Sequence, residues 1–111
     1  MSISDPVTLP AVSYWPATTD VDLDVTTVGA LLRRVAAEVP ERIGLVDGLV
    51  DPAARRRWTY AEMLDAAEAV AAALLARFRP GERVAVWESN RAEWVLLQMG
   101  AALAGIVVVT I

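Results

Sequence analysis

The feature that most constrains the fold is the succession of strand, helix and strand in residues 83–111. The run RVAVWES is apolar and contains β-branched residues, and so is the run IVVVTI at 106–111. Both compositions favour β-strands. The segment between them, NRAEWVLLQMGAALAG, has the periodicity of a helix. A helix that connects two strands in this way predicts a parallel β-α-β unit with a right-handed crossover.

This unit needs more covering than the chain offers. The run IVVVTI shows no polar–apolar alternation, so both of its faces are expected to be buried. Hydrophobic residues make up 56% of the 111 residues, while a chain of this size buries only about two thirds of its surface. Because no turn or cap follows the last strand, we expect residues 26–111 to be part of an incomplete domain, cut within a strand.

Residues 1–25 are expected to form an irregular arm. Three prolines oppose regular structure there: Pro6, Pro10 and Pro16. Tyr14 and Trp15 are expected to anchor the arm by burying their rings. Three carboxylates alternate further along: Asp20, Asp22 and Asp24. They lack the loop geometry of a calcium site, so a solvated loop is favoured over cation binding.

A helix and a hairpin are predicted next. Apolar residues recur on one helical face over 28–39, at Val28, Leu31, Leu32, Val35 and Val39. Thr26 or Thr27 would cap this helix and Pro40 would end it. Residues 42–48 predict a short strand that ends in an Asp-Gly turn, with 55–58 as its antiparallel partner. The basic run Arg55, Arg56 and Arg57 could grip phosphate, but the hairpin rim beside Asp47 and Asp51 is the favoured interpretation.

Two further helices carry recognisable signals at their ends. Thr59 and Glu62 have capping-box spacing, and Pro80 is expected to end that helix. Its opposite side carries three carboxylates that we interpret as solvated: Glu62, Asp65 and Glu68. In the next helix Asn90 is the expected cap, paired with Glu93 in a second capping box, and Gly105 is the expected C-terminal residue.

A ligand site would be expected beside Ser89 and Asn90. Ligands of open α/β sheets bind at the carboxyl ends of strands, near helix N-termini. Ser89 or Asn90 could lie beside an anion there, but a loop residue and a helix cap are the favoured interpretation. The sequence PGERVAV enters a strand and is not a dinucleotide fingerprint. We therefore assign no catalytic, cofactor-binding or metal-binding residue.

The composition excludes several kinds of chemistry. The chain has no Cys and no His, and all ten basic residues are Arg. Disulfides, zinc sites with Cys or His ligands, a Ser-His-Asp triad and a Walker-type loop are therefore excluded within it. A net charge of −4 disfavours nucleic-acid binding. The N-terminus lacks a secretory signal, which favours a cytoplasmic location, and residues 94–111 predict a buried helix and strand rather than a membrane span.

The order and spacing of segments from Thr26 to Ile111 resemble the start of an AMP-forming acyl-CoA synthetase, of the adenylate-forming ligase superfamily. The most telling segments are WTYAEM, FRPGERVAVW and NRAEWVLLQMGAALAGIVVV. The arm sequence SYWPA resembles the N-terminal extension of fatty-acyl-CoA synthetases. The resemblance implies an α/β fold: the N-terminal portion of the large domain, with a short antiparallel hairpin followed by the parallel β-α-β unit.

The resemblance also implies a function for the complete family member. It would activate a fatty or other carboxylic acid with ATP and Mg²⁺, forming an acyl-adenylate, and would then transfer the acyl group to coenzyme A. The family's catalytic lysines and nucleotide-binding motifs have no match here, so the segment itself is expected to be inactive and to be covered by the remainder of the synthetase. Two alternatives stay open: a stand-alone scaffold or binding module, and part of an adenylation domain or aryl-acid ligase.

Overall fold

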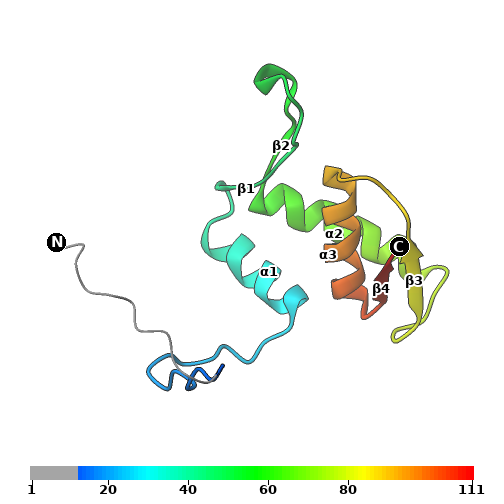
Figure 1. Ribbon diagram of the computed structural model, residues 1–111. Helices are drawn as coiled ribbons and strands as arrows, with labels where there is room; N and C mark the ends of the chain where they lie inside the picture. The colour runs from blue at the N-terminus through cyan, green and yellow to red at the C-terminus, as the bar shows by residue number, and fades with distance from the viewer. Residues whose placement is uncertain (1–12) are drawn as a thin grey trace.

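The computed structural model describes residues 13–111 (Figure 1). Pro6, Pro10 and the N-terminal residues that were predicted not to form a secretory signal lie outside these residues. The elements in chain order are α1 (Val28–Glu38), β1 (Ile43–Val46), the 3₁₀ helix η1 (Pro52–Ala54), β2 (Arg57–Thr59), α2 (Tyr60–Leu75), β3 (Arg83–Val86), α3 (Ala92–Ala104) and β4 (Val107–Thr110). This order confirms the predicted α/β class.

The strands form two separate pairs. Strands β1 and β2 are antiparallel, with Leu45 opposite Trp58. Strands β3 and β4 are parallel, with Arg83 opposite Val107, and α3 connects them. Figure 1 shows the hairpin beside the start of α2 and the parallel pair beside its other end. The predicted hairpin and β-α-β unit are both confirmed.

The core consists of two clusters along α2. Leu32 of α1 meets Met63 and Ala67 of α2 in the first cluster. The second cluster joins α2, α3 and the parallel pair through Ala71, Ala101, Ala104 and Ile106. These residues are mostly small, so the backbones of α2 and α3 can approach each other closely. The clusters hold all three α-helices of the described chain together.

The parallel pair is covered on one face only. Val84 and Val108 pack against the core cluster of α2 and α3. On β4 the alternate residues Val107 and Val109 are exposed, and so is Ile111 after it. Both faces of IVVVTI were expected to be buried. In the described residues only one face is buried, and the apolar outer face is exposed.

Local signals set most helix ends correctly. The Thr27 hydroxyl accepts a hydrogen bond from the Ala30 amide (3.1 Å) and caps α1. The capping box of α2 is complete, with the Glu62 amide 3.2 Å from the Thr59 hydroxyl and the Thr59 amide 2.8 Å from the Glu62 carboxylate. Gly105 ends α3 at φ +69°, a conformation that favours glycine.

Two predicted ends are wrong. Helix α2 stops at Leu75, well before Pro80, because the chain turns there and places Phe78 against the second core cluster. Helix α3 is capped by Arg91 rather than Asn90, and the Arg91 side chain makes no capping hydrogen bond. The second capping box is absent because the Glu93 carboxylate bonds to Arg56 instead.

The expected anchoring of the arm by Tyr14 and Trp15 is also wrong. Their exposed fractions are 68% and 83%. The described part of the arm is irregular, as predicted, but it is tied to α1 by an ion pair between Asp24 and Arg34. This contact between the arm and α1 is thus a surface ion pair, and the two aromatic rings are exposed to solvent.

The helices give no indication of a membrane span. Within residues 13–111, no helix combines the length and apolarity that a bilayer crossing requires. The uncharged segment 94–111 is instead divided into α3 and β4 at Gly105, as the sequence predicted.

Candidate functional site

The loop between β3 and α3 lies at the carboxyl end of a parallel strand. Within this loop Glu88 accepts hydrogen bonds from the Ser89 amide (2.9 Å) and the Ser89 hydroxyl (3.0 Å). Asn90 is exposed and does not cap α3. Both polar groups of Ser89 are thus bonded to a neighbouring carboxylate, which agrees with its interpretation as a loop residue.

Arg56 connects this region to the hairpin. Its Nε and Nη2 atoms both lie 2.8 Å from Oδ2 of Asp47, a buried carboxylate at the end of β1. Its Nη1 atom donates to Oε1 of Glu93 at 2.6 Å. The guanidinium carbon lies 5.1 Å from the centre of the Trp58 ring, within the range of a cation–π interaction. Arg56 therefore joins β1, β2 and the first turn of α3.

Arg91 extends this arrangement into the loop. Its guanidinium lies 3.9 Å from Glu88 and 3.8 Å from Glu93. We refer to the five charged side chains together as the Arg56 network: Asp47, Arg56, Glu88, Arg91 and Glu93. The network contains three carboxylates and two guanidinium groups, and each carboxylate lies within ion-pair distance of an arginine.

Three groups of the network have pKa values shifted in favour of their charged forms: Arg56, Glu88 and Glu93. The hydrogen bond from Arg56 lowers the pKa of Glu93 to about 2. Hydrogen bonds from Ser89 lower the pKa of Glu88, and the two carboxylates raise the pKa of Arg56. A general acid or base works best with a pKa near the working pH. These shifts therefore suit the network to holding elements together rather than to proton transfer.

Acid should selectively remove the contribution of Glu93 to stability. Folding lowers its pKa from 4.5 to about 2, so its ionised form stabilises the folded chain fully above pH 4.5 and loses this effect as the pH falls toward 2. We expect the stability difference between the natural chain and Glu93→Gln to shrink over that interval. Urea denaturation at pH 7, 4 and 2.5 measures it.

The comparison with Glu93→Gln isolates one carboxylate among several. Arg56 and Arg91 face residue 93 in both proteins, and every other acidic side chain is present in both, so their effects are common to the two curves. A stability difference that stays constant between pH 7 and pH 2.5 would contradict the assigned ion pair.

The other polar residues considered from sequence are separate from the network. Arg55 donates to the Leu49 carbonyl (2.6 Å), and Asp51 caps η1 by accepting from the Ala53 amide (2.9 Å). Glu68 pairs with Arg33, while Asp65 is exposed. Within residues 13–111, no cluster of three or more acidic side chains is placed to hold a metal ion. Of the residues named from sequence, the structure thus brings Arg56 together with Asp47 and Glu93, while Ser89 bonds to its neighbour Glu88.

Two cavities flank the first turn of α3. One, of about 190 Å³, lies between the hairpin and α3, and its lining residues are Leu45, Val46, Gly48, Asn90, Arg91, Ala92 and Val95. The other, of about 340 Å³, lies between β3 and α3, with the lining residues Val84, Ala85, Val86, Trp87, Glu88, Glu93, Trp94 and Leu97. Both cavities are mostly apolar, with charged side chains of the network at their edges.

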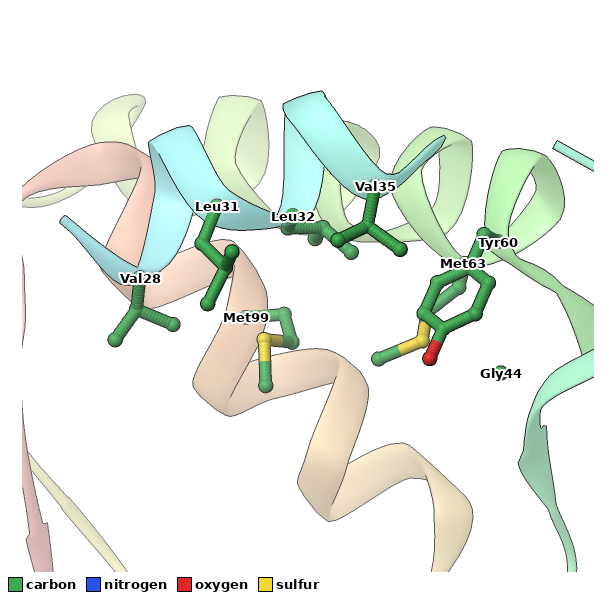
Figure 2. Close-up of a pocket in the computed structure, with 8 residues that line it drawn as sticks. All are labelled: Val28, Leu31, Leu32, Val35, Gly44, Tyr60, Met63 and Met99. Carbon is green, nitrogen blue, oxygen red and sulfur yellow. The ribbon is translucent and has the colours of Figure 1, made fainter. Parts of the chain in front are cut away.

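An apolar groove lies on the other side of the helices (Figure 2). Its volume is about 260 Å³, and its lining residues are Val28, Leu31, Leu32, Val35, Gly44, Tyr60, Met63 and Met99. Figure 2 shows side chains of α1, α2 and α3 directed into this space. Four of the five residues on the apolar face predicted for α1 line this groove, and one of them, Leu32, is also buried in the core together with Gly29 and Ala36.

Residues 32–111 match the family described as AMP-binding enzyme. The chain belongs to this family. Mouse medium-chain acyl-CoA ligase ACSF2, mitochondrial, is 31% identical over 112 residues, which cover 100% of this chain and 18% of the mouse protein. The human ligase of the same name is 35% identical over 100 residues, or 89% of this chain and 16% of the human protein. The chain thus spans less than a fifth of these relatives.

Solved structures of AMP-binding enzymes contain the same fold. A fatty acyl CoA synthetase of Mycobacterium tuberculosis matches 77% of this chain at 35% identity with a TM-score of 0.64, and the match covers 16% of that structure. The N-terminal domain of FACL13 from the same organism matches 78% of this chain at 34% identity with a TM-score of 0.65. These matches confirm the predicted N-terminal portion of an adenylate-forming enzyme.

Sequence reasoning missed the ion pair between Arg56 and Glu93. The two residues lie 37 positions apart, and neither stands at a spacing that predicts contact. Its spacing from Asn90 favours a capping box for Glu93, and the basic run 55–57 favours the rim of the hairpin for Arg56. The position of Arg56 beside Asp47 was predicted correctly, but the bond from its Nη1 atom to Glu93 of α3 was not.

Proposed function

We propose that this chain provides the N-terminal scaffold of an ATP-dependent carboxylic acid–CoA ligase, which forms an acyl-adenylate and then an acyl-CoA thioester. The observation that supports this activity is the identity of 31–35% to the mouse and human acyl-CoA ligases and the mycobacterial fatty acyl CoA synthetase. The names of the two mammalian relatives support a medium-chain fatty acid as the substrate. A cytoplasmic location is part of the same proposal.

The proposed role of this segment is structural. ATP, Mg²⁺ and coenzyme A serve the complete enzyme, but the described residues do not fit a site for ATP or Mg²⁺. Both donors of Ser89 bond to Glu88, and the carboxylates of the Arg56 network face guanidinium groups. No catalytic step is therefore assigned to this segment.

The uncovered apolar surfaces support a role within a larger domain. The groove beside α1 and the outer face of β4 both expose valine or leucine side chains. Exposed apolar patches commonly mark contacts with other protein surface. We propose that the remainder of the synthetase covers both surfaces.

A segment exchange tests the scaffold role directly. In the human ligase, the part that aligns with residues 32–111 is replaced by these residues, and octanoate-dependent ATP–pyrophosphate exchange and octanoyl-CoA formation are measured. We expect both activities within about tenfold of the parent, because a scaffold acts by positioning and not by chemistry. The 111-residue chain alone should show neither activity.

The same exchange with Gly100→Val is the matched control and should abolish both activities by separating α2 from α3. A soluble, folded chimera that forms neither product would contradict the proposed role.

A further inference from the structure

The hairpin and the first turn of α3 face each other across a cavity. The strands of the hairpin pack on α2. Toward α3 they are separated by the cavity of about 190 Å³, which Leu45 and Val46 line from β1 and Ala92 and Val95 line from α3. The Arg56 side chain joins the two sides, because it bonds to Asp47 on the hairpin and to Glu93 on α3.

The hairpin holds the Arg56 guanidinium in one orientation. Asp47 and Arg56 are paired through the backbone, with the Asp47 amide 2.9 Å from the Arg56 carbonyl. The buried Asp47 carboxylate receives both Nε and Nη2, and the Trp58 ring lies beside the guanidinium. A guanidinium is planar, so fixing one edge also directs the remaining nitrogen. That nitrogen, Nη1, is the one that donates to Glu93.

The first turn of α3 packs on the core through Ala92, Val95 and Leu96, but it lacks a side-chain cap. Its capping residue, Arg91, provides no side-chain hydrogen bond to the first amides. Glu93 lies in the first turn, where a carboxylate is favourable beside the positive end of the helix. The bond from Arg56 therefore adds a polar restraint, directed at the hairpin, to a helix start that has no side-chain cap.

We infer that Arg56 is a positioning residue, which holds the first turn of α3 and the preceding loop 87–91 at a fixed distance from the hairpin. In this role the Arg56 side chain helps to position the loop at the carboxyl end of β3, although Arg56 lies far from β3 in the sequence. It goes beyond the proposed ligase scaffold and does not depend on the reaction.

Amide hydrogen exchange of the 111-residue chain, at one pH and without substrate, tests this inference. The main variant is Asp47→Asn with Arg56→Met, which removes the link without leaving a buried, unpaired carboxylate. We expect exchange in residues 95–98, the first amides of α3 with intrahelical acceptors, to rise roughly threefold or more, while exchange in 63–71 of α2 stays unchanged. Arg57→Met is the matched control, since Arg57 makes no ion pair within residues 13–111.

Two single variants separate positioning from general stability. Glu93→Gln keeps the bond between Arg56 and Asp47, so only the first turn of α3 should exchange faster while the hairpin stays protected. Arg56→Lys should behave in the same way, because an ammonium group on the shorter side chain lacks the fork that reaches both carboxylates.

Unchanged exchange in 95–98 for both the double variant and Glu93→Gln would overturn the inference. So would an equal rise throughout α2, which would indicate general destabilisation. Neither result bears on the ligase proposal, which the segment exchange tests separately.

Discussion

Replacing Gly100 by alanine is expected to destabilise the chain by about 1 to 3 kcal/mol. In an ordinary helix interior the same change stabilises by about 0.5 to 1 kcal/mol, because glycine loses more backbone entropy on folding. At position 100 a Cβ would lie 2.5 Å from Cγ1 of Val70 and 2.9 Å from the Ala67 carbonyl oxygen. Helices α2 and α3 would have to separate. Urea denaturation followed by circular dichroism measures the change.

Gly48→Ala is the control for this prediction. A Cβ at Gly48 would meet no atom within 4 Å among the described residues, so the change should alter stability by less than about 0.5 kcal/mol. The double variant Gly100→Ala with Val70→Ala should recover part of the loss, since it removes Cγ1 but leaves the Cβ atom of residue 70. A Gly100→Ala chain as stable as the natural one would mean that α2 and α3 are farther apart than the structure places them.

Features that depend on neighbouring residues were predictable from sequence. The capping box of Thr59 and Glu62 formed because both of its bonds lie within four residues. The turn at Gly105 formed because few other residues adopt its positive φ. The β-branched composition of 106–111 sufficed to predict β4, and the intervening helix sufficed to predict its parallel pairing with β3.

Features decided by distant contacts were not predictable. Glu93 could complete a capping box with Asn90 or bond to Arg56, and spacing favoured the box. The structure has the ion pair because the hairpin brings a guanidinium that is already fixed by Asp47 to the start of α3. The large rings of Tyr14 and Trp15 likewise favoured a prediction that they anchor the arm, but the described arm contacts α1 through the ion pair of Asp24 with Arg34.

The buried side of α1 illustrates the same limit to local pattern. Its apolar stripe includes residues on both sides of Leu32, and hydrophobicity alone did not indicate which would reach the core. Contact with α3 decided the matter, because a Cβ at Gly29 would lie 3.0 Å from the Leu103 side chain and so only a small residue fits there. The close approach at Gly29 turns Leu32 inward and leaves Leu31 toward the groove.

Leu32→Ala should therefore release α1 from the rest of the structure. The Leu32 side chain is 6% exposed and contributes to the cluster with Met63 and Ala67. Truncating a buried leucine costs about 2 to 5 kcal/mol through lost transfer energy and the cavity left behind. Because α1 precedes the hairpin and has few other buried residues, we expect its amides to lose protection first. Urea denaturation and hydrogen exchange over 28–38 measure the two effects.

Leu31→Ala is a matched control one position away. Leu31 is 41% exposed and lines the open groove, so its truncation should cost less than about 1 kcal/mol. The two variants remove the same atoms from adjacent positions of one helix and alter its propensity equally. Their difference therefore measures the packing of Leu32 in the first core cluster. Equal losses for the two variants would mean that the groove is closed in solution and that Leu31 is buried there, whereas a loss confined to Leu32→Ala establishes that α1 docks through its Gly29, Leu32 and Ala36 side.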